Sequence, residues 1–439
     1  MADNAEPKKI IILTASPLRD KLIDEMIADA LRAHGHEVRV APCLREGRPA
    51  VLEMQPDLAV VPPIRNPYSR DMVETMKSWG MGVITRHTEA SCDWQDFRAM
   101  SDREKAEIRG VYPYPADVEL VWGPDEAQML NQRGAPFKAV SVGAFSLDPY
   151  FVEDFDERYR HRDSFCQQYG LDKDKPTVMF LSCWSFADTA PDLHVDSMLK
   201  YKQEREARQQ WIVMMQQVLQ AHPGWNAVLK VHHDESEEPY KVLGERLRLC
   251  KEGLVPEFLA NIDLLIHAGS TMAVEAHCCN LPAFRYVPRT PLTQESWFTR
   301  DNAMGRVSPE ASAAQIIEFM QNPSGGSNAN PEALRELEQG RFGPMDGQAT
   351  RRAAELILTV PGQFKMTWPR SWRNYETPVA KRFMQEIVQA IKCNVCGEVG
   401  YYLVNQNKHD HCVWCGTRIL RLPMEQGAAH APVPAGPQT

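Results

Sequence analysis

Four cysteines near the C-terminal end of the sequence have the spacing of a metal site. Cys393 and Cys396 form one CxxC pair, Cys412 and Cys415 form a second, and a glycine follows each pair directly. Four thiolates at this spacing bind Zn²⁺ in a closed tetrahedron, which leaves no open coordination position for catalysis. We therefore predict a structural zinc ribbon over residues 389–423, with contact to nucleic acid or to another protein as its alternative role.

The stretch IHAGSTMAVEA, residues 266–276, has the composition of an anion-binding turn between a strand and a helix. Small residues let a ligand approach the backbone, and the unpaired N–H groups of a helix start attract phosphate. Phosphate binding is therefore predicted at Gly269, Ser270 and Thr271, and Glu275 is predicted to accept hydrogen bonds from sugar hydroxyls. The alternative is a tight turn whose glutamate faces solvent.

A second group of polar residues closes another predicted strand, in the stretch KVHHDE. Lys230 supplies a positive charge, and His232 or His233 can donate a hydrogen bond to a phosphate. The alternative is a polar strand end with solvated histidines.

A third candidate follows the predicted strand GVIT, in the stretch RHTEAS. Glu89 can take a proton from an acceptor hydroxyl as a general base, or attack as a nucleophile in a double displacement. The imidazole of His87 is the second catalytic candidate here. A structural role of polar loop residues is the alternative.

The overall composition is that of a globular protein without a membrane span. Of 439 residues, 43% are hydrophobic and 24% are charged, and the net charge of −9 does not favour polyanions as partners of the whole molecule. No run approaches the roughly 20 apolar residues of a transmembrane helix. The N-terminus MADNAEPKK lacks the apolar core of a signal peptide, so we expect a cytoplasmic protein with reduced thiols.

Alternating strand and helix patterns organise the first part of the chain. An apolar run at residues 9–16 predicts a strand, apolar residues at helical spacing predict a helix over 19–34, and HEVRVA at 36–41 predicts the next strand. Further strands are predicted at 57–61, 82–85, 118–122 and 139–142. This alternation is typical of a parallel sheet, and we expect a first Rossmann-like unit over residues 1–150, on the acceptor side.

A second alternating series follows a charged segment. Strands are predicted at 177–182, 225–231, 263–267 and 281–286, with an amphipathic helix at 209–221. We expect a second Rossmann-like unit, which binds the donor nucleotide, over 165–360. A connecting helical segment is expected over 361–388 and a disordered tail over 424–439. Two such units place a ligand in the cleft at the carboxyl ends of their strands.

These motifs together resemble the surface carbohydrate biosynthesis glycosyltransferases of capsule and lipopolysaccharide type, which have the two-domain GT-B fold. The resemblance runs in order from about residue 9 to about residue 320. It includes RHTEAS, the end of the first unit at Gly143 and Asp148, KVHH, and IHAGSTMAVEA. It implies transfer of a sugar from a nucleotide-sugar donor to a hydroxyl acceptor. It also implies that the donor is held by His267 together with Lys230, His232, His233, Gly269, Ser270, Thr271 and Glu275.

Two departures leave the donor open. Relatives usually show Arg-Pro-His-Pro at residues 230–233 and Gly-Asn-Pro-Arg-Phe-Asp at 143–148, so both CMP- and UDP-linked sugars are considered. The zinc ribbon is an addition to the family pattern. Because helix N-termini and basic side chains can stabilise the leaving phosphate, we expect chemistry that needs no catalytic metal.

Three other functions are compatible with the same residues. A nucleotide-sugar epimerase would convert its substrate without an acceptor. A glycosyltransferase acting on nucleic acid bases would use the zinc ribbon to hold its acceptor, and its binding would depend steeply on salt. A non-catalytic binding module would keep the fold and lose the chemistry.

Overall fold

The first part of the chain forms a six-stranded sheet in which all strands are parallel. In a computed structural model of the protein, the order across the sheet is β2-β1-β3-β4-β5-β6. The strands are β1 (Lys9–Thr14), β2 (Glu37–Pro42), β3 (Leu58–Val61), β4 (Gly82–Arg86), β5 (Val118–Val121) and β6 (Lys138–Ser141). Every strand predicted from the sequence in this part is confirmed within one or two residues at its ends, because apolar runs between polar loops mark doubly covered strands.

Helices cover both faces of this sheet. Residues Ile10 and Ile12 of β1 pack against α1 (Lys21–Ala33), whereas Ile11 and Leu13 pack against the other side. Alternate side chains of a strand point to opposite faces of the sheet, so β1 contributes side chains to two hydrophobic cores. The helices of the second face are α2 (Gly47–Met54), α3 (Pro67–Ser78) and α6 (Pro124–Gln132).

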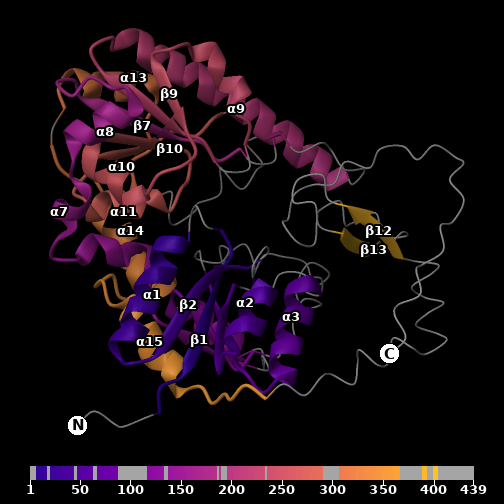
Figure 1. Ribbon diagram of the computed structural model, residues 1–439. Coiled ribbons are helices and arrows are strands. Elements are labelled where there is room, and N and C mark those ends of the chain that lie inside the picture. Colours follow the sequence, from indigo (N-terminus) through magenta and orange to yellow (C-terminus); the bar gives the residue numbers. More distant parts are fainter. Residues whose placement is uncertain are drawn as a thin grey trace, which may run out of the picture.

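The second part forms a five-stranded parallel sheet with the order β11-β10-β7-β8-β9. Its strands are β7 (Thr177–Leu181), β8 (Asn226–Lys230), β9 (Leu247–Cys250), β10 (Leu264–His267) and β11 (Ala283–Arg285). The strand β9 was not predicted, because LRLC carries an arginine and follows a short segment without a helical period. Figure 1 shows each sheet together with its own helices, in two separate parts of the molecule.

The helices of the second unit also lie on both faces of its sheet. One core joins β7 and β10 to α9 (Val195–Ala221) and α13 (Ala313–Gln321). The other core contains residues of α8 (Arg162–Tyr169), α10 (Val255–Asn261) and α11 (Met272–Cys278). The helix α9 begins earlier than the predicted residue 209, since its N-terminal half is polar and shows no apolar period.

The chain returns to the first unit before residue 360, which corrects the expected extent of the second unit. Two α-helices, α14 (Pro331–Glu336) and α15 (Ala349–Thr359), contribute Ala333, Ala353 and Ile357 to the core that contains β1 and α1. They flank the short π-helix η4 (Leu337–Phe342). Figure 1 shows α15 in orange beside the indigo helix α1. The expected boundary at 360 was wrong because sequence position does not reveal which sheet an amphipathic helix covers.

Two short elements connect the units: the 3₁₀-helix η1 (Phe145–Phe151) and the helix α7 (Phe155–Tyr159). A second 3₁₀-helix, η3 (Glu238–Leu243), follows β8. Asp148 of η1 accepts hydrogen bonds from the backbone N–H groups of Ala349 (3.1 Å) and Thr350 (2.6 Å), and so caps α15. The segment η1 therefore ties the end of the first unit to the returning helix.

The structure describes residues 6–16, 20–43, 47–62, 67–87, 116–132, 137–184, 187–188, 195–232, 235–289, 306–323, 325–365, 388–392 and 399–403. Within 361–365 no helix is present, and Lys365 N–H bonds instead to the carbonyl of Trp79. The expected connecting helix is therefore absent from that part, and at residue 388 a strand begins. The rest of it, 366–387, and the expected tail lie outside the described residues. None of the helices in the described part of the chain has both the length and the apolar character needed to cross a bilayer.

Candidate functional site

The carboxyl ends of the parallel strands bring most of the predicted site residues to one edge of each sheet. In the first sheet, β4 ends at Arg86 and His87 follows it. In the second sheet, β8 ends at Lys230 and β10 ends at His267, with the Gly-Ser-Thr turn after it. Ligands of open parallel sheets bind at such edges, so these ends define the candidate site.

The turn after β10 leaves its backbone accessible. Gly269 has φ 152°, and a Cβ at this position would meet no atom of the described residues within 4 Å. Ser270 and Thr271 are half-buried, and the hydroxyl of Ser270 accepts a hydrogen bond from the N–H of Met272 (3.2 Å) at the start of α11. The predicted strand–turn–helix is confirmed, and the φ of 152° is a backbone conformation that favours glycine at residue 269.

His267 shapes the turn from inside the protein. Its side chain is fully buried, and its Nδ1 accepts a hydrogen bond from the N–H of Ser270 (3.3 Å). Burial, aided by the nearby Arg285, lowers the pKa of His267 to about 3. The imidazole is therefore neutral, and its position does not fit the predicted direct contact with a donor: it holds the turn.

Glu275 bonds to a residue of the connecting segment. Its Oε2 accepts a hydrogen bond from the hydroxyl of Tyr150 in η1 (2.6 Å), and both side chains are buried. Burial raises the pKa of Glu275 to about 7, although the Tyr150 hydroxyl opposes the shift. In this structure Glu275 thus accepts a hydrogen bond from a tyrosine hydroxyl of the same chain. The sequence prediction was a hydrogen bond from a sugar hydroxyl.

Lys230 is turned away from the open edge. Its Nζ donates to the carbonyl oxygens of Lys251, Glu252 and Gly253 at 3.2, 3.2 and 3.3 Å, and lies 4.8 Å from the ring centre of Phe258. These contacts close the loop after β9, so the predicted phosphate contact does not fit this side chain.

The two histidines after β8 differ in what the structure describes of them. The half-buried His232 donates its backbone N–H to the hydroxyl of Ser182 (2.8 Å) at the end of β7. His233 lies outside the described residues, and so does Glu89, the predicted base.

His87 is enclosed by two carboxylates. Its Nε2 contacts Oε1 of Glu119, and its Nδ1 lies 3.0 Å from Oε1 of Glu126, all three side chains being buried. Burial alone would lower the pKa of His87, but Glu126 and Glu119 outweigh it and raise the pKa to about 10. A protonated imidazole has no lone pair for a proton, so the predicted catalytic role of His87 does not fit this geometry.

The neighbouring Arg86 makes a buried ion pair with Asp24 of α1, and its guanidinium lies 5.6 Å from the ring centre of Phe145. The sequence prediction missed these acidic partners. One signal was present: Glu119 interrupts the apolar strand VELV, and a buried charge in such a strand requires a partner of opposite sign.

A polar network joins the loops after β7 and β8. The buried carboxylate of Glu235 accepts hydrogen bonds from the N–H of Trp184 (2.5 Å) and from the hydroxyl of Tyr240 (2.6 Å). Its backbone carbonyl accepts one from Lys251 Nζ. Glu235 belongs to the KVHHDE stretch but was not assigned a role, and it fixes the loop that carries His232.

The predicted zinc ligands Cys393, Cys396, Cys412 and Cys415 lie outside the described residues. Two antiparallel strands flank the first pair: β12 (Val388–Lys392) ends directly before Cys393, and β13 (Val399–Leu403) begins three residues after Cys396. Among the residues that the structure describes, no three metal-binding side chains cluster. The zinc ribbon stays a prediction.

No protein-family model matches the chain, and no curated protein matches it. Several solved structures are similar. The H444N variant of the wall teichoic acid polymerase TagF is 11% identical, with 82% of this chain and 90% of that chain covered and a TM-score of 0.50. The UDP complex of MnaA from S. aureus is 14% identical (81% and 100% covered, TM-score 0.48). A UDP-GlcNAc 2-epimerase from Methanocaldococcus jannaschii is 13% identical (80% and 99% covered, TM-score 0.46).

At these identities the likeness is one of fold. The predicted α/β class with two Rossmann-like units is confirmed by the two parallel sheets and by the similarity to TagF.

Proposed function

We propose that this protein is a glycosyltransferase that moves a sugar from a nucleotide-sugar donor, CMP- or UDP-linked, to a hydroxyl acceptor. The observation that carries the proposal is the accessible turn at residues 269–271, at the carboxyl edge of the second of two parallel sheets. The polymerase that shares this fold supports a role in a surface polysaccharide or another glycoconjugate. An epimerase remains the alternative that a product analysis separates.

The turn supports a phosphate site because the open space at Gly269 lies beside the hydroxyls of Ser270 and Thr271, which can donate hydrogen bonds. Among the described residues no atom lies at the open position beside Gly269, and the half-buried Ser270 and Thr271 directly precede α11. In the reaction, the acceptor oxygen bonds to the anomeric carbon while the bond from that carbon to the donor phosphate breaks. The nucleotide leaves with the electron pair, and the acceptor proton passes to a base, for which Glu89 stays our prediction.

A nucleotide-binding screen with two matched variants of Thr271 tests this proposal. Thr271→Glu adds a negative charge at the helix start, which the helix dipole tolerates but a phosphate does not. Thr271→Gln adds the same bulk without the charge. We expect at least one of CMP, CDP, UDP, GDP, ADP and dTDP to raise the melting temperature of the wild type. At a hundredfold excess over Kd, the bound nucleotide should increase the free energy of unfolding by about 2.7 kcal/mol.

The shift should nearly disappear in Thr271→Glu, with binding more than about tenfold weaker, and largely persist in Thr271→Gln. No shift with any nucleotide, or equal shifts in both variants, would contradict a phosphate site on this turn. If a nucleotide binds, incubation with the corresponding nucleotide-sugar in the absence of acceptor distinguishes the two enzymes. Only an epimerase converts the sugar under that condition.

A further inference from the structure

A separate cavity of about 400 Å³ lies at the carboxyl end of β11, the edge strand of the second sheet. It is formed by Tyr286 and Arg289 after β11, Gln210 of α9, and the segment from Glu310 to Gln315 that leads into α13. The volume lies within the range of small-molecule sites, towards its lower end. Among the residues that the structure describes, no predicted donor-binding residue lines it.

The charges in this cavity cancel. Arg289 Nη2 lies 2.5 Å from Oε1 of Glu310, and among the lining residues that the structure describes these two carry the charged side chains. A phosphate or carboxylate ligand would have to compete with Glu310 for the guanidinium. The lining is therefore unsuited to a strongly charged ligand.

The cavity is also too polar for an aliphatic ligand. Among the lining residues that the structure describes, the apolar ones besides Tyr286 are Val287 and two alanines, whereas Gln210 offers an amide. The Ser312 hydroxyl donates its hydrogen to Oε1 of Gln315 and can accept a further hydrogen bond, and an amide both donates and accepts. A hydroxyl-rich neutral molecule matches such a lining.

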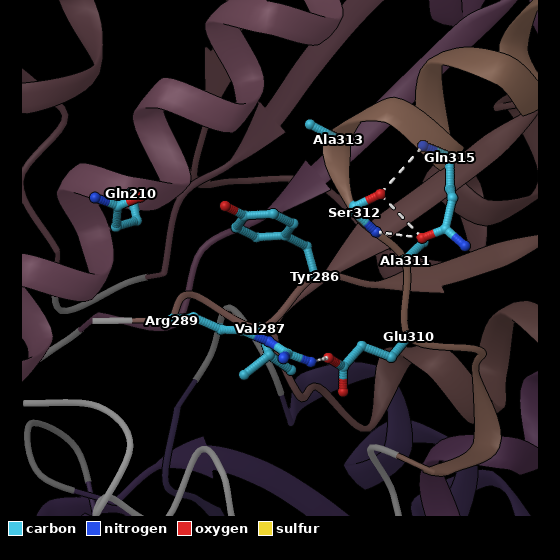
Figure 2. Close-up of a pocket in the computed structure, with 9 residues that line it drawn as sticks. All are labelled: Gln210, Tyr286, Val287, Arg289, Glu310, Ala311, Ser312, Ala313 and Gln315. Carbon is cyan, nitrogen blue, oxygen red and sulfur yellow. Dashed lines mark hydrogen bonds and ion pairs between the residues drawn. The ribbon is translucent and has the colours of Figure 1, made fainter. Parts of the chain in front are cut away.

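The lining is held in place from several sides. The N–H of Tyr286 donates to the carbonyl of His267 (2.9 Å), and the ring centres of Tyr286 and Trp211 are 5.9 Å apart. Ser312 and Gln315 form a capping box, with Ser312 N–H donating to Gln315 Oε1 at 2.9 Å. Figure 2 shows the Tyr286 ring between Gln210 on one side and Ser312 on the other, above the Arg289–Glu310 pair.

We propose that this cavity binds a neutral carbohydrate, with the Tyr286 ring as an apolar platform for a sugar ring and the surrounding amide, hydroxyl and ion-pair groups as partners for its hydroxyls. The backbone bond from Tyr286 to His267 places the occupant beside the strand that leads into the 269–271 turn. The inference concerns a second site and does not depend on nucleotide binding at that turn.

Saturation-transfer difference NMR on the full chain tests the proposal, with maltotriose, cellotriose and triacetylchitotriose as probes at millimolar concentration. We expect transfer to ring protons of at least one probe. Tyr286→Ala should weaken binding about fivefold or more through the lost aromatic contact, whereas Tyr286→Phe should keep it. Phe151→Ala removes an aromatic side chain that is 45% exposed elsewhere and serves as the matched control.

Three outcomes would overturn the proposal: no transfer to any probe from the wild type, an unchanged signal in Tyr286→Ala, or an equal loss in Phe151→Ala. Circular dichroism melts of each variant confirm that it is folded. The nucleotide-induced thermal shift should persist in Tyr286→Ala, so failure of this site and failure of the donor site can be told apart.

Discussion

At the scale of single residues, two of the predicted site residues carry ionisable groups that the fold has removed from water. His87 sits between Glu119 and Glu126, and Glu275 sits against Tyr150. The sequence predicts a catalytic role for His87 and contact with sugar hydroxyls for Glu275, but the structure pairs each of them with other side chains of the protein. Buried charges need partners, and these partners come from elements far away in the sequence.

His87→Leu should destabilise the first unit, because two buried carboxylates would lose their cation. The expected loss is about 3–5 kcal/mol, measured as a lower urea midpoint. The exposed His34→Leu is the matched control and should change little. Because the pKa of His87 is raised from 6.5 to about 10, its contribution is fully present below about pH 6.5 and is lost as the pH rises through about 10. Equal midpoints for both variants would contradict the buried ion-pair cluster.

Glu275→Gln should show a pH dependence of the same sign as His87→Leu, but in a lower pH range. The folded protein binds the Glu275 proton more tightly than the unfolded chain, so the stability of the wild type falls as the pH rises from about 4.5 to about 7. The variant has no charge to bury. The stability of the variant relative to the wild type should therefore increase over this pH range, by up to about 3 kcal/mol in the free energy of unfolding. A higher relative melting temperature would show this increase. The exposed Glu338→Gln should show no such trend, and a parallel trend in both variants would count against the buried carboxylate.

At the scale of elements, the short connecting segment η1 contacts helices of both units. It bonds to α11 through Tyr150 and caps α15 through Asp148. The helix that begins at the predicted phosphate turn and the helix that returns to the first sheet are thus both attached to seven residues. A movement of the two units relative to each other should therefore shift α11 and the turn before it.

Asp148→Ala should release the start of α15. It removes the acceptor of two backbone N–H groups and of the Thr350 hydroxyl, a loss of about 1–2 kcal/mol by analogy with helix caps. Hydrogen exchange of the first turn of α15 should become faster, while α1 exchanges as before. Asp148→Asn keeps one acceptor oxygen and should give a smaller effect; unchanged exchange in the alanine variant would refute the capping role.

At the scale of the whole molecule, two parallel sheets present their carboxyl ends as the candidate site, and a predicted metal module follows them. The described strands β12 and β13 pair with each other on either side of the first CxxC. Such a hairpin is the kind of element that a zinc knuckle requires. The role of this module beside the two units depends first on whether it binds zinc.

The purified full-length protein should contain one tightly bound zinc ion per chain, measured by mass spectrometry of its metal content. Cys412→Ser should lose that zinc, because three remaining thiolates bind it much more weakly. Cys278→Ser, which changes a thiol of α11, is the control and should keep it. A protein free of zinc, or zinc retained in Cys412→Ser, would contradict the ribbon.

The sequence by itself determined the local structure of this protein. Strands such as KIIILT and TVMFL, the helix at 21–33, and the strand–turn–helix around Gly269 follow from apolar periodicity and small residues, which act over a few positions. The predicted accessible turn was found where it was expected for the same reason.

Only the tertiary structure decided which side chains face the open edge. Lys230 binds three carbonyls, His267 supports its own turn, and α15 covers the first sheet, all through contacts between segments distant in the sequence. A strand end shows which residues are near a site, but their direction depends on packing partners that no local pattern contains. Burial then sets the charge of each group, and burial is a property of the whole fold.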